Sequence, residues 1–156
     1  MKLFIQASVA LMVLAFSTIA SWYEGSALVQ SPWEWKHTAI FSNWMNGSIN
    51  QANDILPLDY FIYAAKFSPA YPLAMLLSGT YLLILIGFLL FKGRTKALAY
   101  FLTTVGTVFL ILCSLVSGSP TAGLKMLFST SLSLGILAVA IAVVLFFTNK
   151  NSYVKG

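Results

Sequence analysis

The chain has 156 residues, of which 59% are hydrophobic and 8% are charged, and its formal net charge is +5. Soluble domains carry about 25% charged residues, and a chain this short cannot hide so much apolar surface from water, so the composition excludes a soluble globular domain and indicates a membrane protein. The positive charges lie singly or in a group of three beside hydrophobic runs, which is typical of membrane topology and argues against a nucleic-acid partner.

Four hydrophobic runs divide the chain, each close to the roughly 20 residues that a helix needs to cross a bilayer. They cover residues 3–20, 73–91, 97–117 and 126–147. We therefore predict an all-α membrane protein with four transmembrane helices, in which residues 1–156 form one domain with the lipid bilayer as its partner.

The first run admits two interpretations. Lys2 precedes it and Thr18-Ile19-Ala20 ends it, as in a signal peptide with a small-residue cleavage site. However, the run is long enough to span, and the Trp22-Tyr23 pair that follows is typical of helices anchored at the headgroup level. We favour a retained first helix.

Charge asymmetry predicts the orientation. If the N-terminus is cytoplasmic, six positive residues and no acid lie on that side: Lys2, Lys92, Arg94, Lys96, Lys150 and Lys155. The opposite side carries Lys36, Lys66 and Lys125. The positive-inside rule then places both termini in the cytoplasm, and residues 21–71 form a large external loop at the cell membrane.

This loop holds all four tryptophans, all four acids and the single histidine. Ser31-Pro32-Trp33-Glu34 predicts a helix start with a capping box, and Asn46-Gly47 predicts its end. Trp33, His37, Ile40, Phe41 and Trp44 recur at three- and four-residue spacing, so we expect one amphipathic helix over residues 32–45. Its aromatic face should be buried against the tops of the spans or the bilayer interface.

A second short helix is predicted over Pro57–Phe67, too short to span a bilayer. Asp59 stands in its first turn and Lys66 in its last, an order that suits the helix dipole.

Three patches of the loop carry a family resemblance: SWYEGS from Ser21, PWEWK from Pro32 and LDYFIYAAKF from Leu58. Together they resemble the YjdJ-like family of small uncharacterised four-helix membrane proteins of Gram-positive bacteria. The resemblance implies location and topology, and it brings no active-site residues.

No catalytic, cofactor or metal site is predicted. Glu34 and His37 form one E-x-x-H pair, whereas di-iron bundles use two such pairs and further glutamates. Cys113 is the only cysteine and lies within an apolar run, where it is expected to act as a small hydrophobe. The spans have no ionisable residue in their interiors, which argues against proton-coupled transport.

We therefore predict a non-enzymatic membrane protein of the bacterial envelope that binds a membrane or envelope protein through its external loop. The predicted interaction surface comprises Trp33, Trp35, His37, Phe41, Trp44 and Asp59. A small channel or transporter is the main alternative, and a membrane enzyme is the third.

Overall fold

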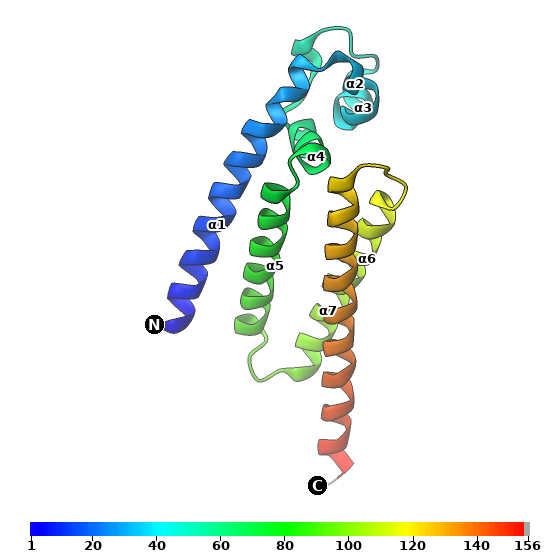
Figure 1. The fold of residues 1–156 in the computed structure, drawn as a ribbon. Helices are drawn as coiled ribbons and strands as arrows, with labels where there is room; N and C mark the ends of the chain where they lie inside the picture. The colour runs from blue at the N-terminus through cyan, green and yellow to red at the C-terminus, as the bar shows by residue number, and fades with distance from the viewer. Residues whose placement is uncertain (155–156) are drawn as a thin grey trace. The chain divides into compact units, whose positions relative to one another are not determined.

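The fold is known from a computed structural model, which describes the backbone of residues 1–154 and the side chains of residues 1–148. Four long helices are present: α1 (Lys2–Gly25), α5 (Ala70–Leu90), α6 (Thr95–Val116) and α7 (Ala122–Val154) (Figure 1). The connection between α1 and α5 contains η1 (Ser26–Gln30), α2 (Pro32–Thr38), α3 (Ile40–Asn46), η2 (Ala52–Asp54) and α4 (Pro57–Phe67). The described backbone contains no strand, so the predicted all-α class is confirmed.

All four long helices are long and apolar enough to cross a membrane, with mean hydropathies between 2.1 and 2.5 in their most apolar stretches. The helices differ from the predicted spans mainly at their ends. α1 continues through Trp22 and Tyr23 to Gly25, and α7 begins at Ala122 rather than Met126. Lys150 and Lys155, used in the orientation argument, lie outside the residues whose side chains are described.

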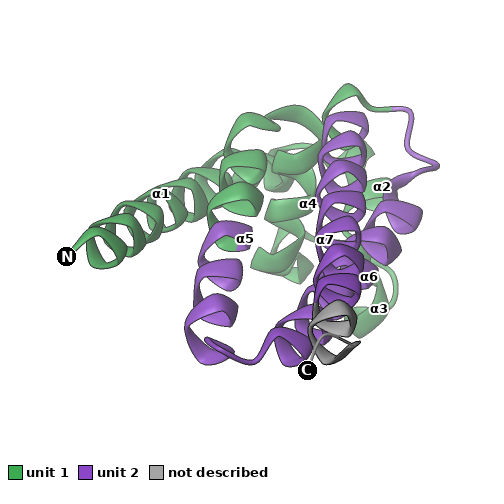
Figure 2. Cartoon of the chain, turned by 90° about the horizontal axis from the view of Figure 1, so that it is seen from below, with its two compact units in different colours: residues 1–79, 121–124 green, residues 80–120, 125–156 purple. Residues whose placement is uncertain are grey.

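The chain divides into two compact units (Figure 2). Unit 1 comprises residues 1–79 and 121–124, and unit 2 comprises residues 80–120 and 125–156. α5 and α7 each begin in unit 1 and continue into unit 2.

In unit 1, α4 packs along the C-terminal half of α1 (Figure 1). Ser17, Ser21 and Gly25 recur every four residues on the buried face of α1. A Cβ at Gly25 would overlap the backbone oxygen of Tyr60, so the two backbones meet at a distance that only glycine permits. Small residues at this spacing are the usual means of close helix approach in membranes.

In unit 2, α6 and α7 approach each other at two glycines. A Cβ at Gly106 would lie 3.0 Å from the backbone oxygen of Gly135. Ala99 and Ser131 are also buried, whereas Thr107 is exposed, and its hydroxyl donates to the Thr103 carbonyl oxygen at 2.9 Å. Gly106, one position earlier, lies at the contact with α7 instead.

Candidate interaction surface in the cap

Residues 26–67, here called the cap, fold around a small core of their own. Leu28, Ala39 and Ile55 are buried there, and Trp35 and Tyr60 pack against them. The Trp35 Nε1–H donates a 2.8 Å hydrogen bond to the Leu28 carbonyl oxygen. Trp35 is therefore a structural residue whose polar and apolar parts are both used within the cap.

Asp59, on α4, binds the N-terminus of α3. Its two carboxylate oxygens each accept a 2.9 Å hydrogen bond from a backbone N–H, one from Phe41 and one from Ser42. The Ser42 hydroxyl donates to the same carboxylate and accepts a 2.7 Å hydrogen bond from Leu56 N–H. Because the first N–H groups of a helix have no partner within it, a carboxylate at this end satisfies them and complements the helix dipole.

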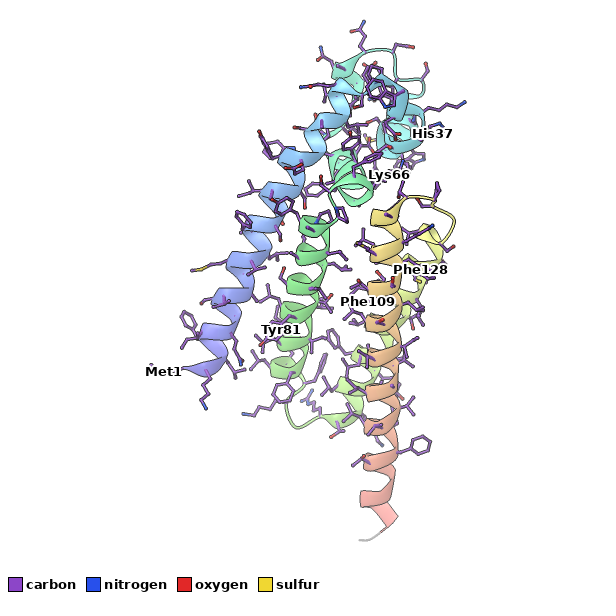
Figure 3. The ribbon with its side chains drawn as sticks, in the orientation of Figure 1. Met1, His37, Lys66, Tyr81, Phe109 and Phe128 are labelled. Atoms are coloured by element: carbon purple, nitrogen blue, oxygen red, sulfur yellow. The ribbon has the colours of Figure 1, made fainter. Side chains whose placement is uncertain are left out.

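Lys66, also on α4, binds the C-terminus of α2. Its Nζ donates to the Thr38 hydroxyl at 2.7 Å and to the His37 carbonyl oxygen at 3.2 Å, and it lies 3.5 Å from a Glu34 carboxylate oxygen. Figure 3 shows Lys66 directed toward the segment that carries His37. The Thr38 hydroxyl donates to the same Glu34 oxygen at 2.8 Å, which closes the network.

These contacts explain why the predicted single helix over residues 32–45 is wrong. In an unbroken helix the Phe41 N–H would bond the His37 carbonyl oxygen. Here that N–H donates to Asp59 and that oxygen accepts from Lys66. The helix therefore breaks at Ala39, which has φ −82° and ψ 63°, and α2 and α3 replace it.

The predicted capping box at the start of this helix is also absent. The Ser31 hydroxyl donates to the Ala27 carbonyl oxygen at 3.2 Å and makes no cap bond, while Glu34 is used by Thr38 and Lys66. The predicted stop is confirmed: α3 ends at Asn46, and Gly47 follows with φ +76°, a conformation that favours glycine.

The aromatic residues of α2 and α3 face outward. Trp33 is 72% exposed and Trp44 is 83% exposed, and Phe41 is also exposed. The residues that turn inward are Thr38, Ala39 and Ser42. The expectation that the aromatic face is buried against the tops of the spans is thus wrong. Its burial at the bilayer interface stays a prediction.

Each helix of the pair presents one outer side. On α3, Ile40, Phe41, Trp44 and Met45 are exposed, and their spacing places them on the same side of the helix. On α2, Trp33, Lys36 and His37 are exposed and likewise share one side of the helix. We call these seven residues the outer face of the cap.

The predicted interaction residues do not all lie on one surface. Trp33, His37, Phe41 and Trp44 lie on the outer face, whereas Trp35 belongs to the core and Asp59 is fully buried. The prediction of Asp59 as a surface residue is wrong, because its carboxylate binds backbone N–H groups within the fold. The predicted set does not contain Thr38 and Ser42, which join the two helices to α4, and their place among the aromatic residues of this segment is the one sequence signal for them.

The polar groups of the cap serve its architecture. In the described part of the chain, no group of three or more His, Cys, Asp or Glu side chains comes together to hold a metal ion. The Glu34 carboxylate is engaged by Thr38 and Lys66, and His37 is exposed. The remaining acids are similarly placed: Ser68 donates to Glu24 at 3.2 Å, and Asp54 accepts from the N–H groups of Asn50 and Gln51.

Four apolar helices of spanning length and a folded cap between the first two define a multi-pass membrane protein. Residues 4–91 match the family described as Domain of unknown function (DUF4306), and the chain belongs to this family. It is 34% identical over 94 residues to the Uncharacterized protein YjdJ of Bacillus subtilis (strain 168), an alignment that covers 59% of this chain and 86% of that protein. The matched region contains the cap and α5, and the YjdJ-like resemblance is confirmed. No solved structure matches the chain significantly.

Proposed function

We propose that the protein is a non-enzymatic accessory component of the bacterial cell membrane, and that its cap binds a membrane or envelope protein through the outer face. The observation that carries this proposal is the exposure of Trp33 and Trp44 on a scaffold that is held from within by the buried Asp59 and the partly buried Lys66. A scaffold held in this way is pre-organised, which lowers the ordering cost of binding.

The composition of the outer face supports a protein partner. Tryptophan, phenylalanine and methionine are enriched in protein interfaces, and tryptophan is prominent among the residues that contribute most binding energy. Trp33, Phe41, Trp44 and Met45 supply these types, and Lys36 and His37 add polar groups beside them.

The assignment to a non-enzymatic class draws on the polar side chains of the cap. A general acid or base must reach a substrate proton. Asp59 is fully buried, and Glu34 and Lys66 are bonded to each other and to Thr38. These groups are therefore committed to holding α2 and α3, which leaves recognition as the role of the cap.

Photo-crosslinking in intact cells tests the proposal. A photoreactive amino acid replaces Trp44 in one variant, and in a matched control it replaces Asn53, an exposed residue of η2 outside the outer face. We expect discrete protein adducts at position 44 and none at position 53, with the adducts lost when Trp33→Ala is added. Adducts to lipid alone at position 44 would contradict the proposal and place the outer face on the bilayer.

A further inference from the structure

Unit 2 contains an apolar cavity of about 400 Å³, which lies between α5, α6 and α7. Its walls include Ile84 and Phe88 of α5, Leu102 and Phe109 of α6, and Leu145 of α7. Thr80 is the one polar side chain among the described residues that line it. Protein interiors are close-packed, with few voids larger than a water molecule, and volumes above roughly 300 Å³ are characteristic of ligand pockets.

The cavity runs along the membrane-spanning part of α6. It extends from Leu98, one turn after the start of that helix, to Phe109, which is labelled in Figure 3. At 1.5 Å per residue this stretch measures about 16 Å, close to half of the roughly 30 Å hydrocarbon core of a bilayer. The cavity is therefore about as long as the hydrocarbon part of one leaflet is thick, and its apolar lining matches an acyl chain.

A basic turn lies at one end of the cavity. Residues 91–94 connect α5 to α6. Gly93 has φ +79°, and the Arg94 N–H donates a 2.9 Å hydrogen bond to the Phe91 carbonyl oxygen. Phe88 and Leu98, which line the cavity, are each about one helical turn from this connection. Lys92 and Arg94 are exposed there, and Lys96 adds a third positive charge.

The charged side chains of unit 2 are all positive. All four acidic residues of the chain lie between Glu24 and Asp59, so unit 2 has no aspartate or glutamate. Lys92 and Arg94 therefore have no carboxylate side chain within their own unit. Basic pockets between transmembrane helices bind the headgroups of anionic lipids, and a negative group at this turn would complement the local charge.

We propose that unit 2 binds one anionic phospholipid. Its phosphate lies at Lys92 and Arg94, and one of its acyl chains occupies the cavity between α5, α6 and α7. The two features complement each other because the apolar cavity ends beside the basic turn, as a phospholipid requires. Unit 2 thereby becomes a specific lipid-binding unit, a role separate from recognition by the cap.

The test uses the full chain purified in detergent and measures the thermal midpoint and, by native mass spectrometry, the number of retained lipids. Phosphatidylglycerol is compared with phosphatidylcholine of identical acyl chains. We expect retention of one phosphatidylglycerol with an apparent affinity about tenfold or more above that of phosphatidylcholine, since each Lys or Arg near a membrane surface contributes on the order of a factor of five. The Lys92→Gln/Arg94→Gln variant should lose this preference, and Lys36→Gln, a cap control, should keep it.

Two further arms separate the headgroup from the acyl chain. Ala138→Leu adds volume to the cavity lining and should reduce retention of phosphatidylglycerol, and glycerol phosphate should not reproduce the stabilisation that the lipid gives. Equal binding of the two lipids, or a preference that survives Lys92→Gln/Arg94→Gln, would overturn the proposal in favour of ordinary annular lipid. Equal stabilisation by glycerol phosphate would overturn the lipid assignment in favour of a soluble phosphate ester. The double variant changes exposed side chains only, so the proposal stays testable if Ala138→Leu does not fold.

Discussion

Asp59 and Lys66 lie seven residues apart on α4 and bind the two helix ends that flank Ala39. Asp59 accepts hydrogen bonds from the N–H groups at the start of α3, and Lys66 donates to the carbonyl oxygen of His37 near the end of α2. Seven residues are about two helical turns, so both side chains leave the same side of α4. The side chains of α4 thus stabilise the break at Ala39 that separates α2 from α3.

Replacing Asp59 should destabilise the cap strongly. Asp59→Ala leaves the Phe41 and Ser42 N–H groups without an acceptor, and Ser42 is fully buried. Unsatisfied buried donors cost about 1–3 kcal/mol each, so we expect a loss of about 3 kcal/mol and a lower thermal midpoint in detergent. Asp54→Ala is the matched control, because this carboxylate also accepts two backbone N–H groups, from Asn50 and Gln51, but at exposed sites. Equal effects of the two variants would contradict the role given to Asp59.

Much of this region could be predicted from local signals. The bounds of α4, Pro57 to Phe67, agree with the prediction, because Pro57 suits the first turn and Ser68-Pro69 ends the helix. The predicted positions of Asp59 in the first turn and Lys66 in the last turn of that helix are confirmed. Their partners could not be predicted, since the bonds to Phe41 and His37 join residues 18 and 29 positions apart in sequence.

The aromatic spacing gave a wrong prediction of burial for a related reason. Periodicity shows which residues share a side of a helix but does not say whether that side meets the protein. Here Thr38, Ala39 and Ser42 pack inward, because only small side chains and hydroxyls fit beside the hydrogen bonds to α4. Once these bonds break the helix at Ala39, the aromatic residues are left on the outer face.

The tryptophans of the cap should therefore differ in their effect on stability. Trp35→Ala removes a ring from the core around Leu28 and Ile55 and a hydrogen bond to Leu28, so we expect a loss of about 3 kcal/mol. Trp44→Ala, at an exposed site, should change the free energy of unfolding by less than about 0.5 kcal/mol. Thermal unfolding of both variants in the same detergent measures the difference. A larger effect for Trp44 would indicate that the outer face is buried in the folded protein.

Gly25 should tolerate no side chain. Gly25→Ala places a methyl group against the Tyr60 backbone oxygen, which cannot move without shifting α4, and we expect a loss of at least about 1–3 kcal/mol. Gly118→Ala is the control, because a Cβ there meets no atom within 4 Å. Urea titration of the purified variants provides the comparison. An unaffected Gly25→Ala variant would contradict the close approach of α1 and α4.

The first helix should remain attached in the mature protein. Cleavage after Ala20 would remove Ser17, one of the small residues buried on the face of α1 that carries Gly25, and would separate Leu14 from its position beside Gly79. Intact mass measurement of protein purified from membranes checks this prediction. A mass corresponding to a chain that starts at Ser21 would support the signal-peptide interpretation.

The orientation of the chain gives the last prediction. Lys92 and Arg94 lie in the α5–α6 connection, and Lys96 follows in the first turn of α6. The positive-inside rule places that connection in the cytoplasm. The cap, at the other end of α5, is then external. Single cysteines at Ser48 and Thr121, introduced in a Cys113→Ala background, should react with a membrane-impermeant thiol reagent in intact cells, and one at Asn151 should react only after the membrane is opened. Because Cys113 is buried, its replacement by alanine removes the one native thiol with a small change of volume. The reverse labelling pattern would place the cap in the cytoplasm and exclude an envelope partner for its outer face.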